Sequence, residues 1–166
     1  WGGANCMDVP VDKGTCDTAQ QQIPPISAFG DEYVAVRYRS RGKGGEESPP
    51  WRILGAAAGT KLTYDPSPPP GAPGAVGLGE VAEFDSPGPF TVRSQDADHP
   101  FAFFTYMSGA GEQGEGGQGD SDFVRMVPPK QFMGHYVFFT DPSYPFTTLT
   151  VVRRKKDGAF RDVELS

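Results

Sequence analysis

Apolar and polar residues alternate along most of this chain with the period of two that half-buried β-strands require. Residues 33–39 are the clearest case, with Val34, Val36 and Tyr38 on one face and two arginines on the other. Further strand-like segments follow, separated by Gly- and Pro-rich turns: residues 51–55, 60–64, 80–84, 90–93, 101–106, 136–139, 149–153 and 160–165. The pattern predicts an all-β fold, an antiparallel β-sandwich with long Gly/Pro loops. β-Propeller blades are the alternative, because short strands and repeated Gly-Thr turns also occur there.

Local features of these segments predict how some of them are placed. An Ala/Gly turn separates residues 51–55 from residues 60–64, which indicates a hairpin. Residues 101–106 form a nearly continuous apolar run, which indicates a strand buried on both faces. No segment has the i, i+3, i+4, i+7 stripe of an amphipathic helix, and residues 130–134 form at most one helical turn.

Two stretches of the chain resemble each other. Residues 23–34 and 127–137 both contain an apolar residue and Pro-Pro, followed by an aromatic residue, a glycine and Tyr-Val. A period near 104 residues predicts one full unit and the opening of a second. We therefore interpret residues 1–166 as a single all-β domain from a larger, repeat-containing protein, with repeats that start near residues 23 and 127. Because the chain begins at Trp1, we expect a mature or excised fragment whose export signal lies upstream.

Composition and charge narrow the possible partners. The 22 glycines and 17 prolines approach low complexity, but 12 Phe, 6 Tyr and 2 Trp supply enough apolar surface for a core. A net charge of −6 disfavours a nucleic-acid partner, whose phosphates need a basic face. No apolar stretch approaches the roughly 20 residues of a membrane helix, so membrane insertion is not predicted. The basic run at residues 153–156 is interpreted as the solvated end of a hairpin, with an anionic glycan or a membrane surface as the alternative contact.

The two cysteines, Cys6 and Cys16, bear on the compartment of the protein. With no histidine nearby and no CxxC spacing, the residues disfavour a zinc site. A small disulfide-closed loop fits better and implies an oxidising, extracellular setting. Two free thiols in a cytosolic protein are the alternative.

Acidic residues provide the candidates for metal binding and catalysis. Asp96, Asp98 and His99 form a polar cluster between two strands. The two carboxylates could bind a cation, or the Asp98–His99 pair could act as acid and base in a hydrolase. An Asx-rich turn that caps backbone amides is the favoured alternative. Asp120 and Asp122 lie in one copy of GGxGxD, the repeat of calcium-binding β-rolls. A single copy cannot build a roll, so a flexible acidic loop is favoured there. These four aspartates are the calcium candidates, and no other cofactor is predicted.

Four segments in order carry a resemblance to a known family: residues 22–34, 59–63, 78–84 and 90–95. They include Ile-Pro-Pro before Phe-Gly-Asp-Glu-Tyr-Val, then Gly-Thr-Lys-Leu-Thr, then Leu-Gly-Glu-Val-Ala-Glu-Phe, then Phe-Thr-Val-Arg-Ser-Gln. Together they resemble the IgG-Fc-binding protein N-terminal domain family, along the whole chain. The resemblance implies an extracellular, non-enzymatic binding or adhesion domain. It supplies no catalytic residues and no Fc contacts.

From these features we expect a secreted or cell-surface module that recognises a glycoprotein, glycan or matrix partner. The contact surface is expected in the loops at residues 66–79 and 108–121, with Trp51, Tyr144 and His99. A structural spacer in a repeat array is one alternative, and it predicts no saturable ligand. A hydrolase around Asp96, Asp98 and His99 is the other, although the chain has no GxSxG motif and only two histidines.

Overall fold

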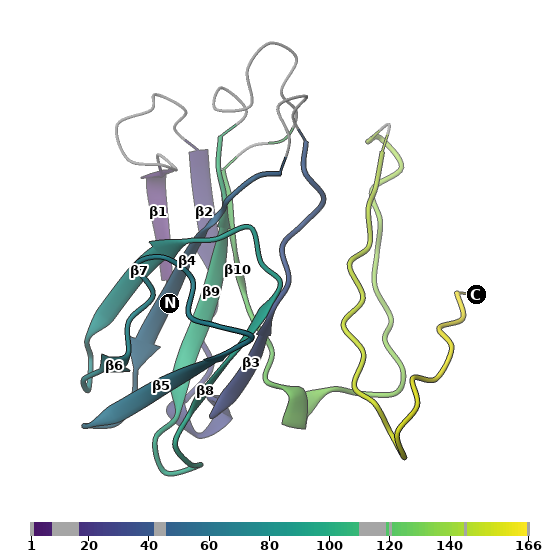
Figure 1. The fold of residues 1–166 in the computed structure, drawn as a ribbon. Coiled ribbons are helices and arrows are strands. Elements are labelled where there is room, and N and C mark those ends of the chain that lie inside the picture. The colour runs from purple at the N-terminus through teal and green to yellow at the C-terminus, as the bar shows by residue number, and fades with distance from the viewer. Residues whose placement is uncertain are drawn as a thin grey trace.

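The computed structural model describes residues 2–7, 17–41, 46–109, 119, 121–144 and 146–165, with only the backbone described for residues 2–7 and 17–19. Strands and two short 3₁₀ helices form its regular structure (Figure 1). They are β1 (Gly2–Met7), β2 (Asp17–Gln21), η1 (Ile26–Ala28), β3 (Glu32–Ala35), β4 (Pro50–Gly55), β5 (Thr60–Asp65), β6 (Ala75–Val76), β7 (Val81–Asp85), β8 (Phe90–Ser94), β9 (Phe101–Met107), β10 (Asp122–Arg125) and η3 (Pro129–Gln131). The described part of the chain contains no helix with the length and apolar character of a membrane span.

Eight of these strands form two antiparallel four-stranded sheets that face each other. One sheet has the order β10-β9-β4-β7, and the other has the order β3-β8-β5-β6. Side chains from both sheets form one core cluster: Tyr33, Ala35, Trp51, Ile53, Leu62, Val76, Phe84, Phe90, Val92, Phe101 and Phe103. This arrangement confirms the predicted β-sandwich-like fold, in place of propeller blades. β1 and β2 pair with each other in a small sheet beside β10.

The predicted hairpin at the Ala/Gly turn after β4 is wrong, because β4 and β5 lie in different sheets. β4 pairs with β7 and β9, whereas β5 pairs with β6 and β8. At the end of β4, Gly55 donates a hydrogen bond to Glu80 O and accepts one from Gly79 N, which ties it to β7. Alternation identifies the buried face of each strand. It does not show that the two strands reach the same core from opposite sides.

β9 is the strand predicted to be buried on both faces, and the structure confirms this. Phe101 and Phe103 point into the core between the sheets. The alternate residues of β9 point outward and join a second cluster with residues that precede β3 and with β10: Ile23, Phe29, Ala102, Phe104, Tyr106 and Phe123. The segment before β3 therefore covers the outer face of this sheet.

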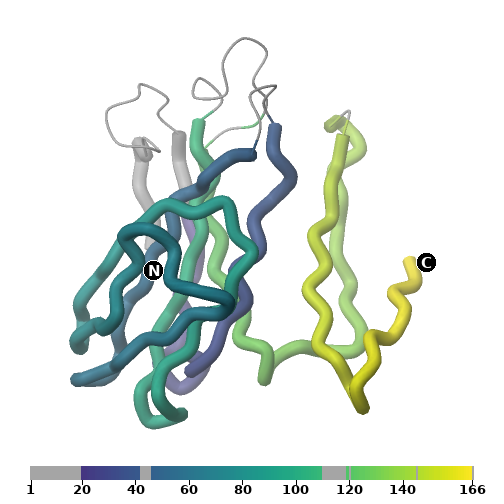
Figure 2. The backbone as a smooth tube through the Cα atoms, viewed as in Figure 1, coloured from purple at the N-terminus to yellow at the C-terminus, as the bar shows by residue number. Residues whose placement is uncertain are grey.

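The last part of the chain, residues 133–165, is named here the C-terminal arm, and it runs alongside the sandwich (Figure 2). The strands predicted at residues 136–139, 149–153 and 160–165 are wrong for this structure: the described residues of the arm contain only one isolated bridge, between Lys156 and Ala159. Many large apolar side chains of the arm are exposed: Met133, Tyr136, Val137, Phe138, Phe139, Tyr144, Phe146, Leu149, Val151, Phe160, Val163 and Leu165. A β-strand needs a neighbouring strand that hydrogen-bonds its backbone N–H and C=O groups. The arm has a strand-like sequence, but in the described chain no neighbouring strand pairs with it.

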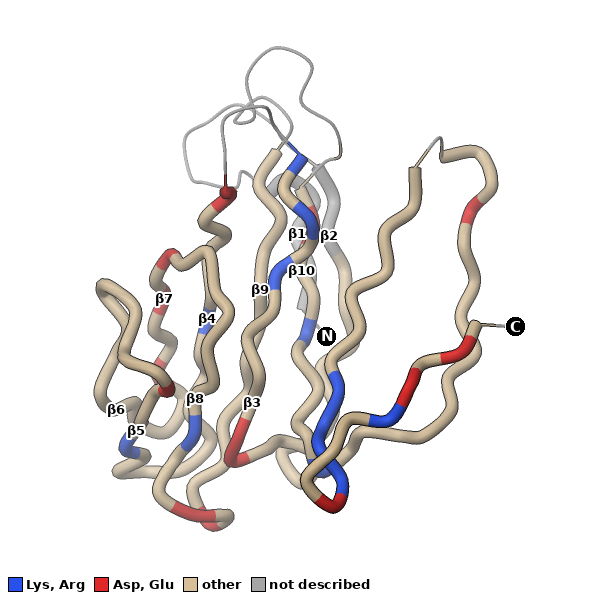
Figure 3. Tube along the Cα trace, turned by 45° about the vertical axis from the view of Figure 1, so that its right-hand side comes forward, with Lys and Arg blue, Asp and Glu red and all other residues tan. Residues whose placement is uncertain are grey.

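The helical turn expected near residues 130–134 is present as η3, one residue earlier. The basic run at residues 153–156 is exposed and leads into the turn that the Lys156–Ala159 bridge closes (Figure 3). Arg153 and Lys155 lie over the ring of Phe160, at 5.2 Å and 5.4 Å from its centroid. This placement fits the interpretation of the run as the solvated end of a hairpin-like turn.

Candidate functional site

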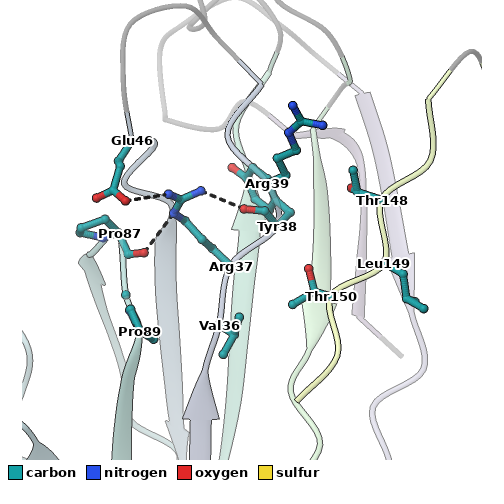
Figure 4. A pocket seen from close by; sticks show the side chains of 11 residues that line it. Val36, Arg37, Tyr38, Arg39, Glu46, Pro87, Pro89, Thr148, Leu149 and Thr150 are labelled. Atoms are coloured by element: carbon teal, nitrogen blue, oxygen red, sulfur yellow. Dashed lines mark hydrogen bonds and ion pairs between the residues drawn. The ribbon is translucent and has the colours of Figure 1, made fainter. Parts of the chain in front are cut away.

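An open groove lies between the sandwich and the C-terminal arm, with a volume of about 480 Å³. One wall is formed by residues 36–39, which follow β3, and the opposite wall by residues 148–150 of the arm. Residues 87–89, which precede β8, and Glu46 complete the lining (Figure 4). The groove therefore brings together segments that lie far apart in the sequence.

The groove begins where the ladder between β3 and β8 ends. The last residue pair of this ladder is Ala35 with Phe90. The next residue on the β8 side is Pro89, which has no backbone N–H to donate. Residues 36–39 therefore leave the ladder, and no named strand of the described chain pairs with the outer edge of β3. Beside the groove, the sheet therefore has a backbone edge that pairs with no strand among the residues the structure describes.

Two arginines supply positive charge to the groove, and their side chains differ in their hydrogen bonds and ion pairs. Arg37 Nε donates to Pro87 O at 3.0 Å, and Nη1 donates to Tyr38 O at 2.9 Å. Its Nη2 lies 3.5 Å from Glu46 Oε1, so Arg37 is fixed as part of the wall. The exposed side chain of Arg39 has no hydrogen bond or ion pair to any residue that the structure describes, so its charge is available to a ligand (Figure 4).

A buried charge network holds the far end of this wall in place. The carboxylate of Glu47 accepts hydrogen bonds from Tyr38 Oη and Arg41 Nη2, both at 2.9 Å, and Arg41 Nη2 also donates to Ser108 O at 2.8 Å. Burial alone would raise the pKa of Glu47, but the hydrogen bonds from Arg41 and Tyr38 outweigh it and hold the pKa below its usual value. Burial, and then the hydrogen bond to Glu47, raise the pKa of Tyr38. At neutral pH an ionised Glu47–Arg41 pair and a protonated Tyr38 therefore fix the wall.

The cluster Asp96, Asp98 and His99 forms a turn between β8 and β9. Asp96 Oδ1 accepts a hydrogen bond from Asp98 N at 3.0 Å and lies 2.6 Å from His99 Nδ1. The hydrogen bond from His99, and then that from Asp98, lower the pKa of the exposed Asp96. These contacts are those of the Asx-rich turn, because the carboxylate serves groups of its own loop.

The three described calcium candidates lie at two separate places. Asp122 lies opposite Met107 at one end of β9, whereas Asp96 and Asp98 belong to the turn that leads into the other end of that strand. Asp122 Oδ1 accepts the N–H of Phe123 at 2.7 Å. Asp120 lies outside the described residues. Within the described part of the chain, no three His, Cys, Asp or Glu side chains are grouped so as to hold a metal ion.

The two aromatic residues expected at the contact surface have different positions. Trp51 is fully buried, donates its indole N–H to Ser86 O at 2.8 Å and stacks on Phe103, so its expected place at the surface is corrected. Large aromatic area and a satisfied N–H make it a core residue. Tyr144 is exposed in a turn of the arm, next to Asp141, and remains available for contacts.

Other expected features are only partly covered by the structure. Cys16 lies outside the described residues, and only the backbone of Cys6 is described, so their pairing remains a prediction. Most of the loop at residues 108–121 also lies outside them. The loop at residues 66–79 contains β6, which pairs with β5, and is tied down further by Tyr64 Oη, which donates to Pro73 O at 2.8 Å.

The groove residues were missed as a site by reasoning from the sequence alone. One signal was present: alternation places Arg37 and Arg39 on the same face of their segment. The approach of Pro87 and Thr148 to these arginines depends on the tertiary fold, which no local pattern encodes.

The fold and the site together define a class: an antiparallel β-sandwich with an open groove at a free strand edge, an arrangement suited to binding extended chains. The chain belongs to the IgGFc binding protein family, whose model matches residues 1–166. This confirms the resemblance expected from the sequence. Comparison with curated proteins and with solved structures gives no match. The family is one of binding proteins, as its name states, and membership in it suggests a binding module.

Proposed function

We propose that this chain is a non-catalytic, extracellular binding module whose protein partner places an extended segment in the groove between the sandwich and the arm. Membership of a family named for binding to IgG Fc supports a protein ligand. The observation that carries the choice of site is the outer edge of β3, which pairs with no strand of the described chain and leads into residues 36–39 and the groove.

Strand addition is the binding mode that this edge favours. An extended peptide beside residues 36–39 gains main-chain hydrogen bonds, which supply affinity independent of its sequence. The groove also has a second extended wall, residues 148–150, whose threonine hydroxyls can donate and accept hydrogen bonds. The bound segment would thus be contacted from both sides.

The charges of the groove select among such segments. Glu46 is paired with Arg37, whereas Arg39 has no partner among the described residues. A carboxylate on the bound segment would gain a charge-assisted hydrogen bond from Arg39. We therefore expect a preference for a segment with an acidic residue at this position.

The test uses IgG Fc, the protein in the name of the family, as the immobilised probe. We expect saturable binding that Arg39→Glu weakens by at least about tenfold, because the reversed charge repels the acidic segment. Arg93→Glu is the matched control, since Arg93 is exposed on β8, away from the groove lining, and its nearest acidic partner is 3.9 Å away.

Each other result of this test has a definite meaning. Equal binding by Arg39→Glu and the wild type would move the site away from the groove. No binding by the wild-type chain would exclude Fc as the partner. A display library of extended acidic peptides, with the same two variants, would then test the groove itself.

A further inference from the structure

Two short segments, 103 residues apart, have the same local structure. η1 follows Pro25 and η3 follows Pro128, and both prolines are extended, with φ/ψ of −61°/156° and −67°/143°. Each turn contains the same pair of backbone hydrogen bonds, and each pair begins from the preceding proline. In the first turn they are Ala28 N to Pro25 O and Phe29 N to Ile26 O; in the second they are Gln131 N to Pro128 O and Phe132 N to Pro129 O. The likeness of the two sequences is therefore also a likeness of structure.

A side-chain detail repeats at the same spacing. Tyr33 Oη accepts a hydrogen bond from Gly30 N at 2.8 Å, three residues earlier. Tyr136 Oη accepts one from Met133 N, also three residues earlier and also at 2.8 Å. A tyrosine hydroxyl that closes the loop after a 3₁₀ turn is a specific arrangement, and its occurrence at both places is independent of the backbone turn itself.

The two tyrosine side chains differ in how far the rest of the protein covers them. Tyr33 is 2% exposed and donates its hydroxyl proton to Phe101 O of β9 at 2.7 Å, while β3 pairs with β8. Tyr136 is 55% exposed, and the residues after it alternate in exposure, with Val137 and Phe139 more open than Tyr136 and Phe138. The less exposed positions are those that correspond to the buried residues of β3. The segment at residues 136–139 therefore has one less exposed face, formed by Tyr136 and Phe138, but no strand of the described chain covers this face.

The rest of the arm follows the order of the first module. After the strand-like residues 149–153 the chain turns at Gly158, with φ of 81°, and continues into residues 160–165. In the first module β4 is followed by Gly59, with φ of 71°, and then by β5. Such positive φ values favour glycine at both turns. The arm thus has, in the same order, a tyrosine-led segment, a strand-like segment and a turn with a left-handed glycine. Its turn is closed by the Lys156–Ala159 bridge, whereas β4 and β5 lie in different sheets.

We propose that the C-terminal arm is the opening of a second β-sandwich module, and that its exposed apolar face is the docking surface for strands that repeat β8 and β9 in the same polypeptide. In the first module, the acceptor of the Tyr33 hydroxyl lies 68 residues further along the chain. The acceptor for Tyr136 is accordingly a backbone carbonyl about 68 residues after it, which lies beyond residue 166. This inference stands apart from the proposed ligand, although it would place the groove between two modules.

Hydrogen exchange tests the proposal by comparing the 166-residue chain with the complete polypeptide that its gene encodes, and a gene product that ends at residue 166 would overturn the proposal at once. We expect the amides of residues 135–139 to exchange at least about 100-fold more slowly at full length, because docked strands protect them. Equal exchange in the two forms would overturn the proposal. Protection that is already present at 166 residues and rises with concentration, together with a dimer in gel filtration, would assign the face to a second copy and also overturn it.

A matched pair of variants separates the two modules. In the full-length protein, Tyr136→Phe is expected to increase exchange at residues 135–139 only, and Tyr33→Phe at β3 and its neighbours only. In the 166-residue chain, Tyr136→Phe should leave exchange in the sandwich unchanged. If Tyr136→Phe has no effect on residues 135–139 at full length, Tyr136 does not repeat the role of Tyr33 and the proposal fails.

Discussion

The segment from η1 to β3 and the segment from η3 to residue 138 begin alike and end differently. Both have a proline-led 3₁₀ turn and a tyrosine hydroxyl bonded to the amide three residues before it. The first becomes a paired and buried strand, whereas the second remains exposed and outside any sheet. The comparison shows that local sequence determines the turn and its tyrosine contact. Strand formation and burial require partners from distant parts of the chain.

The largest difference in stability between the two regions is expected when one phenylalanine ring is deleted from each. Phe103→Ala in β9 should lower the free energy of unfolding by about 3–5 kcal/mol, because Phe103 is 0% exposed and its loss leaves a cavity. Phe139→Ala, at 86% exposure, should change it by less than about 0.5 kcal/mol in this chain. Urea denaturation followed by tryptophan fluorescence measures both. A loss of more than about 1 kcal/mol for Phe139→Ala would mean that the arm packs on the sandwich in solution.

The hydrogen bonds of the two tyrosine hydroxyls should also contribute differently to stability. Tyr33→Phe removes the acceptor of Gly30 N and the donor to Phe101 O, so we expect a loss of about 1–3 kcal/mol. Tyr136→Phe should be nearly neutral in the 166-residue chain, because water can replace its exposed hydroxyl. Thermal melts of the two variants give the difference, and equal melting temperatures would contradict it.

The Tyr33 phenol adds a pH dependence to this second test. Burial raises the pKa of Tyr33 to about 12, from 10.0. A raised pKa in the folded state means that the stability from this phenol is complete below pH 10 and is lost as the pH rises toward 12. We expect the difference in stability between the wild type and Tyr33→Phe to narrow across this range.

Two carboxylates with lowered pKa values, one in each region, should contribute differently to the loss of stability at low pH. Hydrogen bonds from Arg41 and Tyr38 lower the pKa of the buried Glu47, whereas the backbone amide of Ser143 lowers that of the exposed Asp141. A lowered pKa in the folded state gives stability that is present above the usual Glu value of 4.5 and is lost as the pH falls below it. Acid titration of the melting temperature should show this loss in the wild type and a weaker one in Glu47→Gln. The claim for Glu47 fails if both proteins respond to acid alike, and Asp141→Asn should resemble the wild type.

The smallest expected effect concerns the contacts that join the two regions. Gln131 Nε2 donates to Ala28 O at 2.8 Å, so Gln131→Ala should cost no more than about 1 kcal/mol, because the bond is partly exposed. Its larger effect should be on the position of the arm, seen as an increase in maximum dimension by small-angle X-ray scattering. Lys130→Ala removes a more exposed ion pair with Asp31 and serves as the comparison. An unchanged scattering profile for both variants would show that other contacts position the arm.

The sequence predicted the strands with clear alternation, because burial on one face leaves a local signature. β4 has the pattern expected of a half-buried strand, and the continuous run in β9 correctly indicated burial on two faces. β6, with two residues, and the polar β2 have no such signature, so they were missed. The assignment of β4 and β5 to different sheets depends on long-range pairing, which alternation does not encode.

The candidate site was less predictable than the fold. Trp51 was expected at the contact surface, yet its indole N–H donates to the backbone of Ser86 within the core. Arg39 matters because its side chain has no hydrogen bond or ion pair to any described residue, and the groove beside it depends on the end of the β3–β8 ladder before Pro89. Neither property is visible in a local pattern of residues.

The connection between the sandwich and the arm has a mechanical consequence. Pro128 packs so closely on Gly30 that a Cβ added there would overlap the proline ring, and Gln131 and Lys130 are bonded to Ala28 and Asp31 on the same side. These contacts leave residues 128–131 little freedom to move relative to the sandwich. If modules follow one another through such junctions, each would begin at the same place on the one before, and the array would have a regular spacing. A pull on its ends would strain these contacts from the start, without first straightening a loose tether.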